Sequence, residues 1–365
     1  LKIEVPVAGD GYRNYAILPF TPNADTNYTW AMDARNKRSM ALNLKSEQGI
    51  AILHQLIREC DVYVTNQPLP LRRRLKLNYE DIQPLNERMI YASLTPYGED
   101  GPDSENEAFD LVAYWNRSGL MDNMRHAGVE PVQALPGLGD HPTAVSMYAG
   151  IVTALLQRAR TGLGTKVHTS LMANGLWSAS CLAQGKLANA DMSPYYVPRL
   201  TGALYEAADG RWMQLTMIRT DEDFDRLLLA IEAVEVLADE RFATLELRMQ
   251  NGEQLIAILR EKFKQKTSAE WLKLLKDEHA LPIERVTEFG DLRDDEHLMV
   301  NRMVTQPVDD IGIDRVINDP VNVEGVARVG VLKAPDIGEH TDDVLAELGF
   351  DQDAIAALKQ AGVVG

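Results

Sequence analysis

The sequence is poor in cysteine, in aromatic residues and in basic residues. Its 365 residues include only two cysteines, Cys60 and Cys181, whose separation excludes a CxxC redox motif and a cysteine-rich metal site. We therefore expect two buried, reduced thiols in a cytoplasmic protein, with no metal ion. No apolar run is long and uninterrupted enough to span a bilayer, so we expect no membrane segment.

Acidic residues outnumber basic ones, with 54 Asp and Glu against 37 Lys and Arg and a net charge of −17. This balance argues against a nucleic acid or a membrane surface as partner, because both are anionic. An anionic small ligand would need a local basic patch. The densest such patch is Arg72-Arg73-Arg74 with Lys76.

Short apolar strands alternate with helical patterns in the first half of the chain. The pattern predicts a helix over 46–60, strands over 62–65 and 89–94, a short helix over 81–88 and a long helix over 142–160. Such alternation is typical of a parallel, doubly wound α/β sheet. We expect a large α/β domain from residues 1–195 and 325–365.

The middle of the chain has a different pattern. A hairpin with an Asp209-Gly210 turn is followed by helical segments near 221–237 and 251–264. Thr267 and Glu270 have the spacing of a capping box. Residues 200–320 are therefore expected to form a smaller α+β domain. Near the end, Thr341 is expected to cap a last helix that Gly349 ends.

Residues 166–175 lie where a short strand is expected to run into a helix, which is where α/β enzymes position ligands and nucleophiles. This segment belongs to a series of phrases spread over nearly the whole chain. In order, they are Lys2-Ile3-Glu4 with Gly9-Asp10, Asn36-Lys37-Arg38-Ser39, Leu42-Asn43-Leu44-Lys45, Asp61 to Asn66, Tyr91 to Gly98, Phe109-Asp110 with Ser118-Gly119, Arg160 to Gly164, Asp209-Gly210, and Ala334-Pro335 to Thr341. Together the phrases resemble the class III CoA-transferase family, which includes formyl-CoA transferase, carnitine CoA-transferase and the 2-methylacyl-CoA racemases.

The resemblance implies a fold and an assembly. The fold would be a Rossmann-like, doubly wound large domain with a small domain, and two chains would thread through each other as an interlocked-ring homodimer. It also implies a strand and helix before Leu1. The implied substrates are an acyl-CoA and a free carboxylic acid, with coenzyme A as a substrate and no covalently bound cofactor.

The resemblance also assigns the coenzyme A contacts. Asn66 and Gln67 follow a strand's carboxyl end, and Arg74 matches the family's arginine in a cluster suited to phosphates. Lys37 and Arg38 have a weaker claim, because this segment can also anchor a loop. Leu42 matches a position that lines the adenine pocket, although a leucine there can equally belong to the core.

The family's nucleophile is an aspartate in the strand-to-helix junction, where it attacks the acyl-CoA thioester. This position holds Ala173, whose methyl group can neither attack nor leave. Either an engineered replacement or a natural divergent subgroup would explain it, and the unforced small-residue surroundings favour the natural case. Candidate substitutes are Asp110, Asp140, His168 and Asn174. Asp110 matches an acidic position that supports the active site in relatives, but it can also cap the helix that follows.

Three functions remain open at this point. The first is a CoA-transferase, and the second is a racemase or isomerase acting at the α-carbon of an acyl-CoA. In the racemase branch a histidine opposes the aspartate, and here that position is Asp122, with His126 one turn later. The third is a catalytically silent CoA-binding subunit. The formyl-CoA transferase glycine loop has no counterpart between residues 187 and 214, which favours an acceptor acid larger than oxalate.

Overall fold

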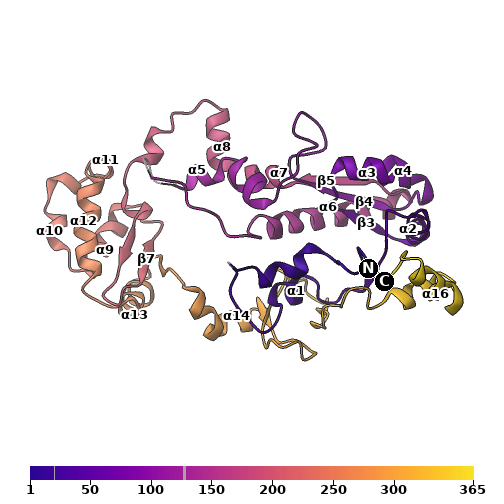
Figure 1. Cartoon of the computed structure of the whole chain (residues 1–365). Coiled ribbons are helices and arrows are strands. Elements are labelled where there is room, and N and C mark those ends of the chain that lie inside the picture. Colours follow the sequence, from indigo (N-terminus) through magenta and orange to yellow (C-terminus); the bar gives the residue numbers. More distant parts are fainter. Residues whose placement is uncertain (20, 126–128) are drawn as a thin grey trace. The chain divides into compact units, whose positions relative to one another are not determined.

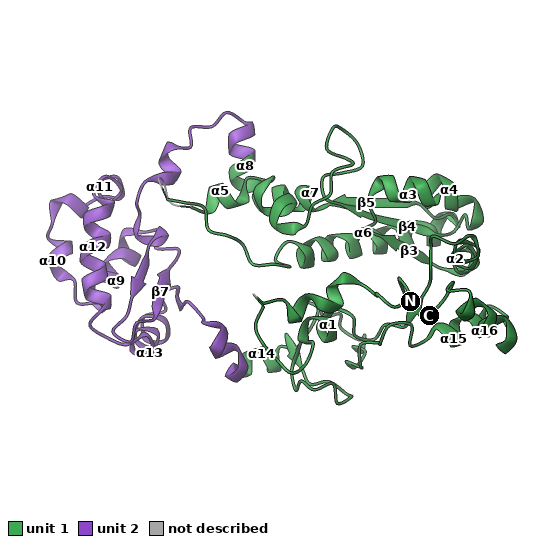
Figure 2. Ribbon diagram, viewed as in Figure 1, with its two compact units in different colours: residues 1–125, 129–183, 296–365 green, residues 126–128, 184–295 purple. Residues whose placement is uncertain are grey.

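The structure is a computed structural model that describes residues 1–19, 21–125 and 129–365. The chain forms two compact units. Unit 1 comprises residues 1–125, 129–183 and 296–365, and the described part of unit 2 comprises residues 184–295 (Figure 2). Among the described residues, no helix combines the length and the apolar character needed to cross a membrane.

The central element of unit 1 is a parallel three-stranded sheet. Its strands are β3 (Val62–Thr65), β4 (Ile90–Thr95) and β5 (Lys166–Ser170), in the order β3-β4-β5 (Figure 1). A second parallel pair joins β1 (Lys2–Glu4) to β2 (Ser39–Ala41). The parallel sheets expected of an α/β fold are thus present, whereas a Rossmann-like sheet and an interlocked dimer stay predictions.

The two faces of the β3-β4-β5 sheet differ in chemistry. Thr65 pairs with Ser93, and Ser93 pairs with His168, so these side chains share one face because strand residues alternate between faces. Helix α3 (Leu69–Leu75) contributes Arg72 to this polar face. On the opposite face, a Cβ added to Gly150 of α6 (Asp140–Thr161) would lie 2.6 Å from Val167 Cγ1, so this helix packs closely on β5.

Apolar periodicity and capping explain the helices around this sheet. In α2 (Glu47–Glu59), Ile52, Leu53 and Ile57 are buried on one side, and the Ser46 hydroxyl caps the helix by accepting from Gly49 N at 3.0 Å. The same core contains residues from both ends of the unit. The other helices of unit 1 are α1 (Tyr28–Asp33), α4 (Tyr79–Ile82), α5 (Leu120–Met124), α7 (Leu171–Ser178), α14 (Glu296–Val300), α15 (Thr341–Glu347) and α16 (Gln352–Gln360), with 3₁₀ turns at Gly11–Ile17 and Gln83–Leu85 and a π-helix at Leu111–Asn116.

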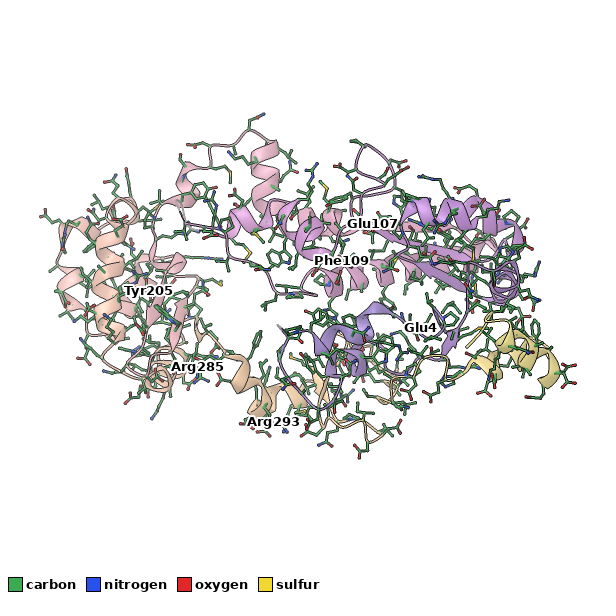
Figure 3. All side chains as sticks on the ribbon, in the orientation of Figure 1. Glu4, Glu107, Phe109, Tyr205, Arg285 and Arg293 are labelled. Atoms are coloured by element: carbon green, nitrogen blue, oxygen red, sulfur yellow. The ribbon has the colours of Figure 1, made fainter. Side chains whose placement is uncertain are left out.

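A buried ion pair ties the first residues to β2. Glu4 is 4% exposed and receives two hydrogen bonds from Arg13, at 2.8 and 2.7 Å, and one from the Ser39 hydroxyl at 2.6 Å (Figure 3). The Arg13 guanidinium lies 3.9 Å from the Trp30 ring centroid. Because both carboxylate oxygens of Glu4 accept charge-assisted hydrogen bonds from Arg13, this network offsets the cost of burying the carboxylate.

Unit 2 is an antiparallel sheet packed against helices. Its strands are β6 (Leu204–Glu206), β7 (Trp212–Leu215) and β8 (Ile283–Arg285), in the order β6-β7-β8. Gly210 makes the expected turn with a φ of 75°. The core contains an aromatic group, with Tyr205 stacked on Phe263 and Phe263 against Trp271. The helices are α9 (Asp221–Ala230), α10 (Val234–Leu237), α11 (Leu245–Gln250), α12 (Gly252–Phe263) and α13 (Ser268–Trp271), with 3₁₀ turns at Ser193–Tyr196, Leu200–Gly202, Glu240–Phe242 and Phe289–Asp294 and a π-helix at Leu272–Glu278.

Most predicted elements are found, with instructive differences. The capping box of Thr267 and Glu270 is confirmed. The helix expected over 221–237 is broken between α9 and α10, where Glu232 has a φ of 58°. Thr341 does not cap α15, which begins at Thr341 itself, because its hydroxyl accepts from Ala41 N in β2.

The prediction of two buried thiols is wrong for Cys181. Both cysteines are free, Cys60 is partly buried and Cys181 is exposed. Cys181 lies on α8 (Ser180–Leu187), a helix with no buried residue. Its apolar residues do not gather on one face, so burial of the thiol does not follow from the helical pattern. The remaining strands, β9 (Val304–Thr305) and β10 (Val316–Ile317), form an antiparallel pair.

Candidate functional site

The junction of β5 and α7 is built as the sequence predicts, and Ala173 lies in the first turn of the helix. Ser170 is the N-cap, and its hydroxyl accepts a hydrogen bond from Ala173 N at 3.1 Å. Met172 N donates to Pro96 O at 3.0 Å, which ties the junction to the segment after β4. Ala173 itself is exposed. A side chain at this position therefore reaches solvent from a fixed backbone.

Two of the candidate substitutes lie close to Ala173 in sequence but differ in availability. The Asn174 amide is buried and donates to Thr169 Oγ1 and Ser170 O, both at 2.8 Å. Both of its N–H groups are thus used in holding the junction. His168 is exposed on β5, on the polar face of the sheet.

Asp110 is a buried structural acceptor. It is 4% exposed, whereas the adjacent Phe109 is 86% exposed (Figure 3). One carboxylate oxygen accepts from Leu111 N at 2.9 Å, as expected of a cap, and the other accepts from Gly139 N at 3.1 Å. Both oxygens are engaged, so Asp110 links the π-helix at 111–116 to the start of α6.

Asp140 begins α6 and has the electrostatics of a reactive carboxyl. The residue is exposed by surface area, yet the protein around it removes enough water to raise its pKa from 3.8 to about 6. Repulsion from Asp110 and, more weakly, from Asp33 adds to this effect, while His141 opposes it. The pKa is thus matched to proton transfer or attack near neutral pH. Helix α6 also contacts α7, the helix that carries Ala173.

His141, beside Asp140, is held by two partners. Its Nε2 lies 3.1 Å from Asp33 Oδ1, and its Nδ1 lies 2.9 Å from Gly137 O. The hydrogen bond to Asp33 raises the pKa of His141, and although burial alone would raise that of Asp33, the hydrogen bond from His141 holds it below its usual value. Tyr12 completes the group, donating from its hydroxyl to Asp33 Oδ2 at 2.7 Å. Within the part of the chain that the structure describes, no group of His, Cys, Asp and Glu has a metal-binding arrangement.

The predicted coenzyme A contacts at the end of β3 remain accessible in part. Asn66 is exposed, Gln67 is half-buried and Arg74 is exposed on α3. The Gln67 side-chain oxygen is buried without a hydrogen-bond partner among the described residues. Arg74 and its neighbours therefore leave cationic groups near a strand's carboxyl end, where parallel sheets bind ligands.

The other predicted contacts are engaged in the fold. Lys37 Nζ donates to the Asp33 carbonyl, and withdrawal from water lowers its pKa. Arg38 forms a two-pronged ion pair with Glu347, with N–O distances of 3.0 and 2.9 Å. Leu42 is 1% exposed in the core of unit 1. Their roles toward coenzyme A stay predictions.

The racemase residues can be placed only in part. Asp122 accepts from Arg125 Nε at 2.7 Å on the surface. His126 lies outside the described residues.

Three residues of this region were not singled out by the sequence motifs, namely Glu99, Asp33 and His141. The adjacent acid and histidine at 140–141 were a usable sequence signal, whereas Asp33 joins them only in the folded chain.

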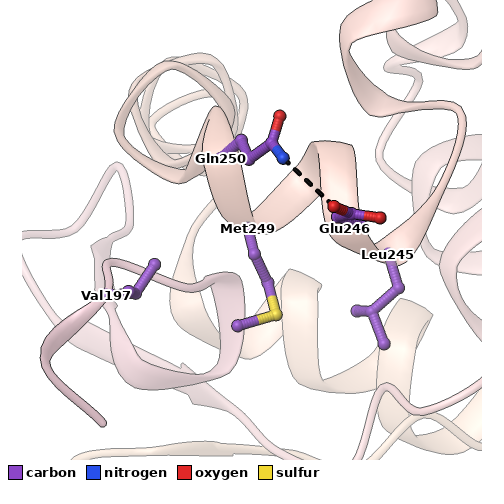
Figure 4. A pocket seen from close by; sticks show the side chains of 5 residues that line it. All are labelled: Val197, Leu245, Glu246, Met249 and Gln250. Carbon is purple, nitrogen blue, oxygen red and sulfur yellow. Dashed lines mark hydrogen bonds between the residues drawn. The ribbon is translucent and has the colours of Figure 1, made fainter. Parts of the chain in front are cut away.

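Unit 2 has a shallow apolar hollow of its own, lined by Val197, Leu245, Glu246, Met249 and Gln250 (Figure 4). Its polar groups pair with each other, because Gln250 donates to Glu246 at 3.4 Å. Its lining is mostly apolar and its single carboxylate already accepts from Gln250, so we assign no reaction to this hollow.

Comparisons with known proteins identify the family. The profile described as CoA-transferase family III matches residues 1–341. The chain is 30% identical over 371 residues to (R)-2-hydroxy-4-methylpentanoate CoA-transferase of Clostridioides difficile, covering 100% of this chain and 92% of that protein. This chain belongs to CoA-transferase family III, as the motifs indicated.

Two further similarities agree with this assignment. Cinnamoyl-CoA:phenyllactate CoA-transferase of Clostridium sporogenes is 29% identical over 374 residues, covering 99% of this chain and 89% of that protein. The crystal structure of a CAIB/BAIF family protein from Brucella suis has a TM-score of 0.81 and 25% identity, covering 95% of this chain and 91% of that one. Sequence and fold therefore match family members over nearly the full length of both chains.

Proposed function

We propose that this protein moves coenzyme A between an acyl-CoA and a free carboxylic acid, with Asp140 taking the covalent role that Ala173 cannot perform. The observation that carries the proposal is the exposed Asp140 carboxyl with a pKa raised to about 6, on a helix that contacts α7. Of the candidate substitutes, Asp110 has both oxygens engaged, Asn174 has both N–H groups engaged, and His168 supplies no carboxylate.

The chemistry needs a carboxylate that can both attack and leave. Asp140 attacks the thioester carbonyl, the C–S bond breaks, and an acyl-aspartyl anhydride and a CoA thiolate form. The thiolate attacks the aspartyl carbonyl, giving a protein thioester and the free donor acid. The acceptor carboxylate then attacks this thioester to form a new anhydride, and the thiolate takes the acyl group from it. Asp140 is restored, so acyl groups and charge balance.

Arg74, the exposed Asn66 and the half-buried Gln67 are assigned to the coenzyme A phosphates and nucleotide in this proposal. For the acceptor we propose a 2-hydroxy acid with a branched or aromatic side chain. Support comes from the names of two relatives, one acting on 2-hydroxy-4-methylpentanoate and the other on phenyllactate. The active form is proposed to be the interlocked homodimer, with residues 1–195 and 325–365 as the coenzyme A domain.

The test is an exchange assay with intact-mass detection. Wild-type protein is mixed with cinnamoyl-CoA and 2-hydroxy-4-methylpentanoate, and new acyl-CoA is measured by chromatography. We expect exchange and a hydroxylamine-sensitive adduct on Asp140. The Asp140→Asn variant should lose both, while Asp353→Asn, which changes an exposed aspartate of α16, should lose neither.

Three results would decide against the proposal. Exchange by Asp140→Asn at the wild-type rate would exclude Asp140 as nucleophile. An inactive wild type combined with an active Ala173→Asp variant would identify a coenzyme A-binding subunit that has lost its reaction. Deuterium incorporation at the α-carbon without exchange would instead support the isomerase alternative.

A further inference from the structure

Arg72 is a buried arginine whose hydrogen-bonding edge is only half used. The residue is 1% exposed, although its neighbours Arg73 and Arg74 on α3 are exposed. Its Nη1 donates to Ser93 Oγ at 2.7 Å and lies 3.2 Å from both Tyr91 Oη and Glu99 Oε1. Its Nε and Nη2 are also buried, and neither has a partner among the described residues.

The unused atoms are the pair that recognises oxyanions best. The Nε–H and Nη2–H bonds of a guanidinium point in parallel on the same side, a geometry that matches two oxygens of a carboxylate or phosphate. A buried guanidinium pays a desolvation penalty that hydrogen bonds must offset. In Arg72 only Nη1 makes hydrogen bonds that offset this penalty. The edge formed by Nε and Nη2, called the fork below, lacks the partner that its burial requires.

The ion-pair group that contains Arg72 has more positive than negative charges. Glu99 binds both Arg72 and Lys166, so this linked group holds two cations and one carboxylate. Although burial alone would raise the pKa of Glu99, hydrogen bonds from Lys166 and Ser93 hold it below its usual value, and Glu99 is therefore ionised. These three linked side chains therefore carry a net charge of +1.

The ion-pair partners of Arg72 reach the surface, although Arg72 itself does not. The side chain of Lys166 is 30% exposed and that of Glu99 is 10% exposed, in contrast to Arg72. Gln67, whose side-chain oxygen is also buried without a partner among the described residues, precedes the same helix. Both unpartnered groups therefore follow β3 in the chain, Gln67 in the loop after the strand and Arg72 in helix α3 (Figure 1).

We propose that the free fork of Arg72, which is linked through Glu99 to Lys166, binds an oxyanion that presents two oxygens. A carboxylate and a phosphate group share this chemistry. The site is separate from the carboxyl group of Asp140 and does not depend on the proposed transferase reaction, because it concerns binding alone.

The test is the thermal stability of the full chain under anion titration. Ligands that bind only the folded state raise the melting temperature along a saturable curve. Inorganic phosphate and acetate are titrated separately at near-neutral pH, with ionic strength balanced by sodium chloride. We expect a saturable rise for wild type, retained in Arg58→Met, which removes an exposed arginine of α2. Arg72→Lys keeps the charge but loses the fork, and the saturable part should disappear.

Repeating the phosphate and acetate titrations with coenzyme A present distinguishes the source of the anion. If saturating coenzyme A abolishes the phosphate response, the site takes a phosphate group of that molecule. If the acetate response survives coenzyme A, the site takes a carboxylate. Absence of a saturable response in wild type, or an equal response in Arg72→Lys, would overturn the proposal.

A second measurement covers the case in which Arg72→Lys does not fold. Wild-type crystals grown without phosphate are soaked in selenate, and the anomalous signal of selenium is mapped. A peak within hydrogen-bonding distance of Arg72 Nη2 is expected. A map with selenium elsewhere but none at the fork would overturn the proposal.

Discussion

The pH dependence of the exchange rate tests the role of Asp140 most directly, because its carboxyl group has a pKa of about 6 instead of the usual 3.8. If the attacking species is the carboxylate, the rate follows its ionised fraction. The value of kcat/KM should then fall to about half of its plateau at pH 6 and to about a tenth at pH 5. An aspartate with an ordinary pKa would still be more than about 90% ionised at pH 5.

The assay is the exchange rate at low acyl-CoA concentration from about pH 4.5 to 8, at constant ionic strength. Asp110→Asn supplies the second arm, since repulsion from Asp110 contributes to the raised pKa of Asp140. This variant should move the acidic limb to lower pH. A wild-type profile that stays flat down to pH 5 would refute the assignment, as would a limb that Asp110→Asn leaves in place.

The same shift has a consequence for folding stability. The pKa of Asp140 is raised by folding, so the folded protein holds the proton more tightly than the unfolded chain does. The contribution of Asp140 to stability must therefore fall as pH rises from about 4 to about 6, and its charged form is destabilising above that range. Asp140→Asn should raise the melting temperature at neutral pH but not near pH 4. A variant that is less stable than wild type at neutral pH would contradict this sign.

Three further predictions concern other parts of the chain. Arg74→Met should raise the KM for acyl-CoA by about 10-fold or more without loss of stability, because Arg74 is exposed and charge-assisted contacts to phosphate are strong; steady-state kinetics and thermal melting check this. Trp271→Ala should lower the free energy of unfolding by about 3–5 kcal/mol, since the ring is 1% exposed in the unit 2 core, as measured by urea titration. His141→Gln should remove a stabilisation that is present below about pH 6.5 and fades as pH rises through the raised pKa of His141, and melting curves across that range will show it.

Matched controls keep these predictions separable. For Arg74 the control is Arg58→Met, and an equal rise in KM there would indicate a general charge effect. For Trp271 the control is Trp177→Ala, an exposed tryptophan at 77%, whose cost should be far smaller. For His141 the partner variant Asp33→Asn should remove the same pH dependence, and its persistence in both variants would assign it to another group.

Local patterns predicted much of the fold because their causes are local. The strand at 62–65, the long helix of α6 and the capping box at Thr267 depend on alternation, periodicity and hydrogen bonds within a few residues. Where long-range contacts compete, prediction failed. Thr341 was expected to cap a helix, but its hydroxyl bonds to the backbone of β2, 300 positions earlier.

The candidate site divides in the same way. Motifs along the chain were enough to identify the family and the strand-to-helix junction, and they predict that Ala173 stands at the family's nucleophile position. They could not rank the candidate substitutes, because a carboxyl's pKa depends on the charges that folding brings near it. Asp110 and Asp33 lie 30 and 107 positions from Asp140 in sequence, and both act on it only in the folded unit.

The sequence by itself determined the family, the parallel α/β plan and the presence of an alanine at position 173, since each of these depends on residue identity and order. Only the tertiary structure decided which carboxyl is perturbed and which arginine is buried. The sequence alone does not distinguish Arg72 from Arg73 and Arg74. In the folded chain Arg72 is buried, donates to Ser93 and has no partner for its Nε and Nη2 among the described residues. Burial and through-space charge are properties of the packed chain, and they set the chemistry that the order of residues leaves open.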